Sequence, residues 1–269
     1  MVVLQSIEEF QKYRKNIDVT IGFVPTMGAL HEGHMSLVEC AKAQNDVTVV
    51  SIYVNPTQFL AGEDLERYPR TIEQDLQKCQ EYGVDAVFLP SNLYTSDEVG
   101  IKAPNIRGYI LEGHFRPGHF DGVLQVVMKL LNITQPTRAY FGKKDAQQYL
   151  LICQMVQDFF MSVEVIGCPT VRHSDGLAKS SRNIYLDANQ RQRALSIYKS
   201  LHFIEQNITK MQLQTLITKA KEHLQIDSLQ YLQITNYALQ PIQKYEKNDT
   251  LVTIAGFVGT TRLIDNLWI

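Results

Sequence analysis

The sequence has no long hydrophobic run, because nowhere in its 269 residues do about 18 consecutive apolar residues occur, the length that a membrane-spanning helix needs. The first residues, MVVLQSIEEFQKYRKN, lack the apolar core of a signal peptide. Basic residues form no extended run and the formal net charge is -2, so the electrostatic signature of a nucleic-acid-binding protein is missing. These absences predict a cytoplasmic protein that binds neither membranes nor nucleic acids.

Cysteine is scarce, and its spacing is uninformative about metals. Cys40, Cys79, Cys153 and Cys168 lie far apart with no C-x-x-C pair, so the sequence indicates neither a disulfide framework nor a thiolate zinc site. We expect these residues to be small, buried and apolar. The remaining composition, 45% hydrophobic and 20% charged, is typical of a globular protein with one large domain or two smaller ones.

The first 170 residues alternate between short β-branched runs and longer helical patterns, which indicates βαβ units around a parallel sheet. Strands are predicted at residues 19–24, 47–54, 84–89, 139–141 and 163–166, and helices at 33–44, 71–82, 120–133 and 145–160. The run at 47–54 is continuously apolar, as in a strand buried on both faces. The expected fold is therefore α/β, with a Rossmann-like, doubly wound parallel sheet.

The pattern changes after Asn183. Helices are predicted at residues 188–205 and 212–225, and strands at 230–235, 252–258 and 262–268. This order is typical of a smaller α+β domain. We therefore predict two domains, residues 1–172 and residues 173–269.

The segment PTMGALHEGH, residues 25–34, lies where the first strand passes into the first helix, which is the edge where open α/β sheets bind ligands. Gly28 lets the backbone approach a ligand, and Gly33 lets the helix start pack tightly. Unpaired N–H groups and the helix dipole there favour phosphate. His31 and His34 are three residues apart, so both imidazoles can donate hydrogen bonds to phosphate oxygens as charge develops on them.

Two other interpretations of these histidines stay open. A lone histidine in a turn is more often solvated or bonded within the protein, although glycines after a strand favour phosphate. A zinc site is the second alternative. Its ligands could come from His31, Glu32, His34, His114, His119 and Asp121. The H-E-G-H spacing differs from the i, i+4 spacing of a helical zinc motif, which makes zinc the weaker interpretation.

The H-x-G-H pattern resembles the signature of the nucleotidyltransferase superfamily that includes class I aminoacyl-tRNA synthetases, and the whole segment resembles the pantothenate synthetase family. Further matching motifs follow in the family's order. They are NPTQF at 55–59, YPRT at 68–71, GHFDGV at 118–123, FGKKDAQQ at 141–148 and DGLAKSSRN at 175–183. The resemblance spans roughly residues 20 to 190, and ordered composite motifs are far more specific than one glycine motif.

The resemblance implies an ATP-dependent ligase that condenses (R)-pantoate with β-alanine to pantothenate, AMP and pyrophosphate through a pantoyl-adenylate, in pantothenate and coenzyme A biosynthesis. It also implies Mg²⁺, a homodimer, an N-terminal domain that binds ATP and pantoate, and a C-terminal lid domain. Two alternatives are a nucleotidyltransferase that leaves the nucleotide on its product and a non-catalytic nucleotide-binding protein on the same fold.

The resemblance also implies roles for individual residues, without assigning metal ligands. The catalytic residues would be His31, His34, Lys144 and Arg182. ATP would contact Met27, Gly28, Ala29, Leu30, His31, Glu32, Gly33, His34, Gly142, Lys143, Lys144, Asp145, Val171, Lys179, Ser180, Ser181 and Arg182. Gln58 and Gln148 would bind pantoate, with Gln58 also near β-alanine. The neighbourhood of the pantoate pocket would include Glu63, Asp64, Tyr68, Glu112, Arg116 and His119.

These assignments agree with the chemistry of the side chains. Gln58 follows a buried strand, and an amide offers both a donor and an acceptor to a hydroxy acid. Lys144 joins a strand to a helix start and can neutralise phosphate charge, while Asp145 can cap that helix or engage the nucleotide. The serines and Arg182 of residues 179–182 can clamp a triphosphate, and Gly176 gives that segment freedom to close.

Each of these segments also has a simpler interpretation. Gln148 could be a solvated helix position, the paired lysines an exposed turn, and Ser180 part of a polar linker. The chain also departs from the family pattern at four positions. They are Lys143 in place of Glu, Ala146 in place of an aromatic residue, His173 in place of Glu and Lys179 in place of Met. The two added lysines would raise the positive charge beside a triphosphate.

Overall fold

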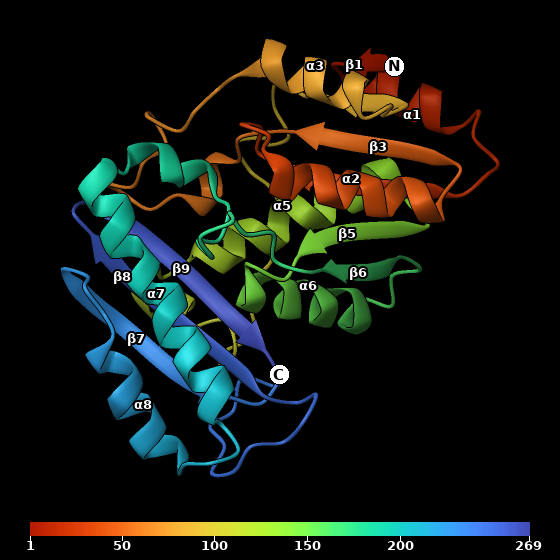
Figure 1. Cartoon of the computed structure of the whole chain (residues 1–269). Coiled ribbons are helices and arrows are strands. Elements are labelled where there is room, and N and C mark those ends of the chain that lie inside the picture. The colour runs from red at the N-terminus through yellow and green to blue at the C-terminus, as the bar shows by residue number, and fades with distance from the viewer. The chain divides into compact units, whose positions relative to one another are not determined.

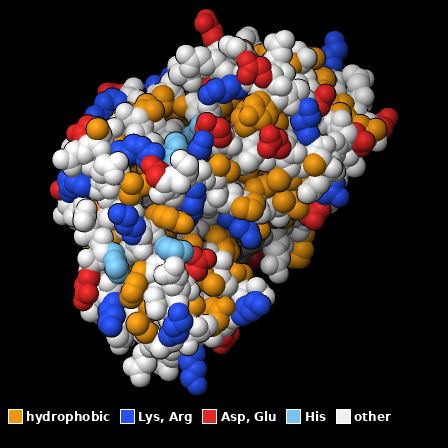
Figure 2. Space-filling view, viewed as in Figure 1, with side chains coloured by type: hydrophobic (Ala, Val, Ile, Leu, Met, Phe, Trp, Pro, Cys, Tyr) orange, Lys and Arg blue, Asp and Glu red, His pale blue; other side chains and the backbone are white.

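The computed structural model describes all 269 residues, and the chain divides into two compact units (Figure 1). Unit 1 comprises Met1–Lys143 and Leu151–Pro169, and unit 2 comprises Lys144–Leu150 and Thr170–Ile269. No helix combines the length and the apolar character that crossing a membrane requires. On the face shown in Figure 2, basic, acidic and hydrophobic side chains are interspersed, which agrees with the near-neutral net charge.

Unit 1 contains a sheet whose strands are β1 Val2–Leu4, β2 Ile21–Thr26, β3 Val47–Ile52, β4 Ala86–Phe88, β5 Arg138–Gly142 and β6 Glu164–Cys168. Its helices are α1 Ile7–Arg14, α2 Glu32–Gln44, η1 Pro56–Gln58, α3 Ile72–Glu81, α4 Glu112–Phe115 and α5 His119–Thr134. Helix α6, Ala146–Asp158, begins within unit 2 and ends within unit 1.

The six strands lie in the order β1-β4-β3-β2-β5-β6, and every pair is parallel. Val24 of β2 and Val50 of β3 belong to one buried cluster with Val38 of α2, so α2 covers that face. On the opposite face, Phe88 of β4 packs against Phe10 of α1, with ring centroids 4.9 Å apart. Helices on both faces confirm the predicted Rossmann-like, doubly wound α/β architecture.

The strand β1 and the helix α1 are absent from the sequence prediction. Ser6 caps α1 by accepting the backbone N–H of Glu9 at 3.1 Å, and the Glu9 carboxylate accepts the N–H of Ser6 at 3.2 Å. This reciprocal pair is a capping box, so the S-x-x-E pattern was the signal that could have identified the helix.

Unit 2 is an α+β structure, as the sequence predicts. Its elements are η2 Ser181–Tyr185, α7 Ala188–Asn207, α8 Leu213–Glu222, β7 Ser228–Thr235, β8 Leu251–Val258 and β9 Thr261–Trp268. The three strands form an antiparallel sheet in the order β7-β8-β9. Leu201 of α7, Leu216 of α8 and Ile254 of β8 are fully buried in its core. The predicted roles of the two domains, substrate binding and lid, stay predictions.

Candidate functional site

The turn between β2 and α2 carries the predicted phosphate-binding segment. Gly28 and Ala29 both have left-handed backbone conformations, with φ of 83° and 49°. The hydroxyl of Thr26, at the end of β2, donates to the carbonyl of Ser51 at 2.7 Å and accepts the N–H of Gly28 at 3.2 Å. The turn is therefore tied to the end of the neighbouring strand.

The sequence analysis expected the N–H groups of this turn to be unpaired. In the structure, two of them are already hydrogen-bonded within the protein. Ala29 and Leu30 donate their N–H groups to the carboxylate of Asp75, at 2.9 and 2.7 Å. Asp75 comes from α3, 45 residues along the chain from Leu30, so no local pattern could reveal this contact. Phosphate binding at this turn remains a prediction, and these two N–H groups already have a partner within the protein.

His31 and His34 lie side by side at the start of α2, with ring centroids 4.1 Å apart. Nδ1 of His31 accepts the N–H of Gly33 at 3.1 Å, and Nδ1 of His34 accepts the N–H of His31 at 3.3 Å. Because Nδ1 is the acceptor in both rings, each neutral imidazole carries its proton on Nε2. The helix cap thus fixes the tautomer of both rings and makes each Nε2 a hydrogen-bond donor.

The amide of Gln58, in η1, is oriented by a chain of hydrogen bonds. The Asn55 amide donates to Oε1 of Gln58 at 3.0 Å and to the carbonyl of Gly122 at 3.1 Å. The Tyr94 hydroxyl donates to Oδ1 of Asn55 at 2.7 Å, and burial raises the pKa of Tyr94 to about 12, so it stays protonated. Nε2 of Gln58 lies 3.0 Å from the sulfur of Met27. Gln58 therefore presents its N–H₂ group on the side of Met27.

A second network holds the backbone of Gln58. Nδ1 of His119 lies 2.7 Å from the carbonyl of Gln58, and Nη1 of Arg116 lies 3.0 Å from Nε2 of His119. A guanidinium can only donate, so Nε2 accepts and Nδ1 carries the proton. Burial and the Arg116 charge lower the pKa of His119 to about 4, which keeps the ring neutral at pH 7.

Arg116 is held in turn by a two-bond ion pair with Glu63, at 2.6 and 2.7 Å. Burial raises the pKa of the Glu63 carboxyl, but its hydrogen bonds with Arg116 and the Arg116 charge outweigh this and lower it overall. Three residues that the sequence analysis placed near the pantoate pocket, Glu63, Arg116 and His119, thus form one network ending at Gln58.

Helix α5 approaches η1 more closely than a side chain would allow. A Cβ atom on Gly122 would lie 2.3 Å from the carbonyl oxygen of Thr57 and 2.7 Å from the nitrogen of Gln58. Only glycine fits such a contact, which explains the second glycine of the GHFDGV motif.

The zinc alternative has no supporting cluster, because no three His, Cys, Asp or Glu side chains gather in a way that could hold a metal ion. Both ring nitrogens of His119 lie within hydrogen-bond distance of protein groups. The Asp121 carboxylate accepts the N–H of Ala103 at 2.8 Å. The residues proposed as zinc ligands therefore include two that serve the protein's own hydrogen bonding.

In unit 2, Lys144 and Asp145 lie at the start of α6, with Nζ and Oδ1 3.3 Å apart. The carbonyl of Lys144 accepts the side-chain amide of Asn266 at 2.6 Å, which ties this helix start to β9. Gln147 is buried, whereas Gln148 is half-buried. Gly142, which ends β5, and Lys143, which follows it, are the other members of this motif and belong to unit 1.

The serine-rich segment of unit 2 follows a tight hairpin. The N–H of Lys179 donates to the carbonyl of Val171 at 3.0 Å, and the N–H of His173 donates to that of Leu177 at 2.8 Å. Gly176, with φ of 96°, lies at the tip, where a Cβ would collide with the Tyr198 ring. This hairpin positions the start of the Lys179–Arg182 segment.

Arg172 secures the base of the hairpin. Its guanidinium donates to both carboxylate oxygens of Asp265, at 2.6 and 2.9 Å, and to the carbonyl of Gly176 at 3.1 Å. Beyond the hairpin, Ser180 caps η2 by accepting the N–H of Arg182 at 3.3 Å. Ser180 is thus the cap of a 3₁₀ helix.

Comparison with known proteins decides the family. Residues 2–268 match the family model described as Pantoate-beta-alanine ligase. The pantothenate synthetase of Aliarcobacter butzleri (strain RM4018) is 51% identical to this chain over 273 residues, covering 100% of both. The chain belongs to the pantoate–β-alanine ligase family. The pantothenate synthetase of Helicobacter pylori (strain Shi470) is 48% identical, again over 100% of both chains.

Solved structures of this family share the fold. The pantothenate synthetase of Thermus thermophilus matches with a TM-score of 0.95 at 38% identity, covering 100% of this chain and 99% of that one. The pantoate–β-alanine ligase of Francisella tularensis, complexed with β-γ ATP and β-alanine, matches with a TM-score of 0.84 at 40% identity, covering 100% and 97%. Family membership and fold therefore agree along the whole chain.

Several residues that hold the candidate site were missed by the sequence analysis. Asp75 and Lys78 contact the turn, Asn55 contacts Gln58 and Tyr94 contacts Asn55, but none of the four received a role. Asn55 precedes Gln58 in the NPTQF motif, so that motif could have identified it. The other three lie far in sequence from the groups they contact and carry no local signal.

Proposed function

We propose that this member of the ligase family activates pantoate with ATP and then joins it to β-alanine. The observation that carries this proposal is the reciprocal cap of His31 and His34, which fixes two Nε2 donors at the helix start after β2. Such donors suit oxygen atoms on which negative charge develops during displacement at phosphorus. The first products are pantoyl-adenylate and pyrophosphate.

In the first step, a carboxylate oxygen of pantoate attacks the α-phosphorus of ATP, and the bond from that phosphorus to the bridging oxygen of pyrophosphate breaks. His31 and His34 donate hydrogen bonds to phosphate oxygens, and Lys144 and Arg182 neutralise phosphate charge. Charge neutralisation matters because pantoate and ATP are both anions and must come into contact. Positioning of the two reactants supplies most of the remaining catalysis in such a step. The backbone and side chains of the other predicted ATP-binding residues line the nucleotide.

In the second step, the amine of β-alanine attacks the acyl carbonyl of pantoyl-adenylate. AMP leaves with the bridging oxygen, and the nitrogen loses a proton as the amide of pantothenate forms. The N–H₂ group of Gln58 donates to an oxygen of pantoate, as its fixed orientation favours, and Gln148 provides a second polar contact. These two roles rest on the motif match.

Mg²⁺ is proposed to enter as part of the substrate MgATP. The chain offers no cluster of three metal-binding side chains, and Mg²⁺ in such enzymes is commonly held through substrate phosphates and water. Removing divalent cations with a chelator should therefore stop turnover, and adding Mg²⁺ back should restore it fully.

The test of the function is to mix the protein with MgATP, pantoate and β-alanine and to follow pantothenate and AMP. Steady formation of both should need all three substrates. A nucleotidyltransferase would instead leave the nucleotide on its product, and a nucleotide-binding protein without catalytic activity would bind ATP and release no AMP. Either outcome would reject the proposal.

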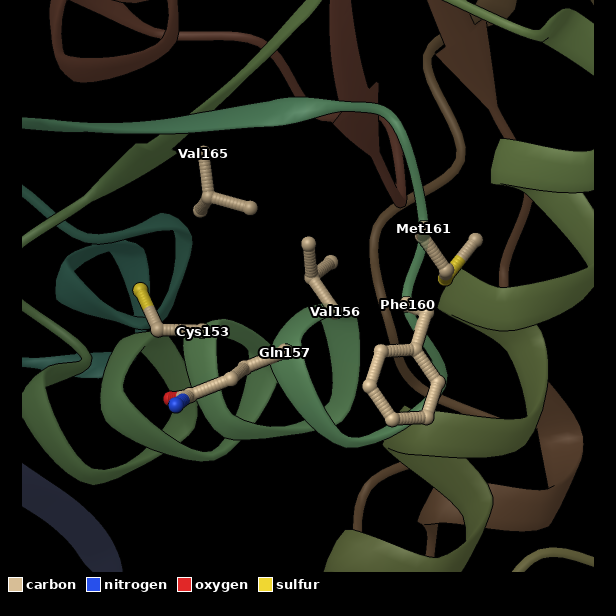
Figure 3. Close-up of a pocket in the computed structure, with 6 residues that line it drawn as sticks. All are labelled: Cys153, Val156, Gln157, Phe160, Met161 and Val165. Atoms are coloured by element: carbon tan, nitrogen blue, oxygen red, sulfur yellow. The ribbon is translucent and has the colours of Figure 1, made fainter.

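We also propose a homodimer formed along the β6 edge of unit 1. Beside this edge lies an apolar hollow lined by Cys153, Val156, Gln157, Phe160, Met161 and Val165 (Figure 3). Phe160 is 92% exposed and the adjacent Phe159 57% exposed, so two neighbouring large hydrophobic residues just after α6 face solvent. A second copy could cover them by a two-fold contact. Sedimentation should show a dimer that Phe160→Glu weakens. A monomeric wild-type protein would reject the dimer, and a dimer that Phe160→Glu leaves intact would exclude this surface.

A cytoplasmic location also remains our proposal. All four cysteines are free thiols, which is typical of proteins kept in a reducing compartment.

A further inference from the structure

The turn before the histidine pair carries backbone strain that its glycine alone does not explain. Gly28 tolerates its φ of 83°, but Ala29 also has a positive φ, 49°, which is unfavourable for a residue with a Cβ atom. Strain of this kind persists only where the surrounding structure holds the backbone in place, and it is found most often at functional sites. The residues that hold this turn are therefore of interest.

Helix α3 holds the turn through two side chains on one face. The carboxylate of Asp75 accepts the N–H groups of Ala29 and Leu30, at 2.9 and 2.7 Å, and the side chain is almost fully buried. Nζ of Lys78 donates to the carbonyl of Leu30. Asp75 and Lys78 are three residues apart on the helix, so they reach the same side of the turn.

The choice of side chains fits this task. A carboxylate is an acceptor at both oxygens, so it satisfies two neighbouring N–H groups, whereas an amide would direct a donor at one of them. A Cβ atom on Gly28 would lie 3.0 Å from Oδ2 of Asp75, so the carboxylate occupies the space that the glycine leaves. Thr71 donates to Oδ1 of Asp75 at 3.3 Å and supports it from its own helix start.

We propose that Asp75 and Lys78 are positioning residues for the formation of the acyl-adenylate. They fix the backbone of residues 28–30, and this sets where His31 and His34 present their Nε2 atoms. Leu30 directly precedes His31, the cap of α2, so a displacement of the turn passes to both rings. This inference rests on the proposed function, in which the two rings contact the phosphates of ATP.

The first test compares Asp75→Asn with Asp85→Asn. Asp85 is the matched control because its carboxylate also accepts a backbone N–H, that of Thr48 at 2.8 Å, in the same sheet but away from the turn. In single turnovers with MgATP and pantoate, Asp75→Asn should release pyrophosphate about 10- to 100-fold more slowly, as expected for a small misplacement of reacting groups. The Asp85→Asn rate should stay close to that of the wild type.

The second test compares Lys78→Met with Lys42→Met, and it leaves the buried carboxylate of Asp75 in place. Nζ of Lys42 donates to the carbonyl of Tyr82 at 2.7 Å, so the control loses the same kind of bond at the far end of α3. Lys78→Met should slow pyrophosphate release several-fold, and Lys42→Met should not. The later attack of β-alanine on preformed adenylate should change little in either variant.

A rescue experiment separates positioning from general stability. Ala29→Gly removes the cost of the positive φ, so in the Asp75→Asn background it should recover part of the lost rate. Rates of Asp75→Asn and Lys78→Met within about threefold of their controls would overturn the proposal. If Asp75→Asn does not fold, the comparison of Lys78→Met with Lys42→Met alone tests the proposal. An inactive wild-type protein would instead reject the proposed function.

Discussion

The turn at residues 28–30 and the hairpin at residues 171–179 both precede proposed phosphate-binding side chains, but they are held in different ways. The turn is strained and depends on a buried carboxylate from a distant helix. The hairpin is closed by its own backbone hydrogen bonds and secured by the Arg172–Asp265 ion pair, with Arg172 partly exposed. The comparison indicates that the histidine pair is placed by the core of unit 1, whereas the serine-rich segment follows a hairpin that its own hydrogen bonds and an ion pair within unit 2 hold.

The largest expected effect comes from removing one histidine that the turn presents. His34→Ala should lower the rate of AMP formation by about 100- to 1,000-fold, the loss typical of one electrostatic hydrogen-bond donor at a reacting centre. Circular dichroism should be unchanged because His34 is only partly buried. His202→Ala, at an exposed position on α7, is the matched control and should keep its rate. Equal rates for the two variants would remove His34 from the site.

A smaller effect is expected where α5 approaches η1. Gly122→Ala would place a Cβ atom against the carbonyl of Thr57, so η1 and Gln58 must move. The KM for pantoate should rise about tenfold, and overpacking should lower the free energy of unfolding by about 1–3 kcal/mol. Gly100→Ala, where a Cβ atom would meet nothing within 4 Å, is the control. An unchanged KM for pantoate would indicate that Gln58 does not bind pantoate.

The hairpin should respond in stability more than in chemistry. Arg172→Lys keeps the charge but loses the two-bond contact with Asp265, which is 5% exposed. We expect the free energy of unfolding of unit 2 to fall by about 1–3 kcal/mol, measured by denaturant titration. The rate of pyrophosphate release should fall less than in Asp75→Asn. A larger loss of rate in Arg172→Lys would reverse the proposed difference between the two regions.

At neutral pH the smallest effect is that of His119, whose contribution appears only as a pH dependence of stability. Burial lowers its folded-state pKa to about 4, below the ordinary value of 6.5, so the unfolded chain takes up a proton first as the pH falls. Stability from this residue is therefore complete above pH 6.5 and is lost as the pH falls toward about 4, by roughly 1.4 kcal/mol per pH unit. Arg116, Glu63 and Glu112 contribute to the surrounding charge.

The check is to measure the free energy of unfolding of wild type and His119→Gln between pH 7.5 and pH 4.5. The amide of glutamine can still donate to the carbonyl of Gln58 but does not titrate. The difference between the two proteins should shrink as the pH falls. A constant difference would mean that His119 has no lowered pKa in the folded protein.

The sequence predicts the fold well because periodicity is a local property. Residues 47–54 read as a buried strand, and β3 covers Val47–Ile52 with nearly every side chain buried. Glycines and histidines at fixed spacing likewise marked the start of α2. By contrast, the contact of Asp75 with Leu30 joins residues that are 45 positions apart, and a polar residue on a surface helix looks the same whether or not it reaches a turn. Such contacts depend on tertiary packing.

The division of the chain into two units is another feature that a local sequence motif could not predict. The KKD motif looks continuous in sequence, yet Lys143 belongs to unit 1 and Lys144 to unit 2. The carbonyl of Lys144 is held by Asn266, more than a hundred residues later, which no pattern near Lys144 could indicate.

The most direct test of the account follows the oxygen atoms of pantoate. With pantoate labelled with ¹⁸O in its carboxylate, attack on the α-phosphorus followed by attack of β-alanine on the carbonyl must transfer one labelled oxygen to AMP. We predict that mass spectrometry will show one ¹⁸O atom in the phosphate of each AMP formed. Unlabelled AMP, or label found only in other products, would contradict activation of pantoate as an acyl-adenylate.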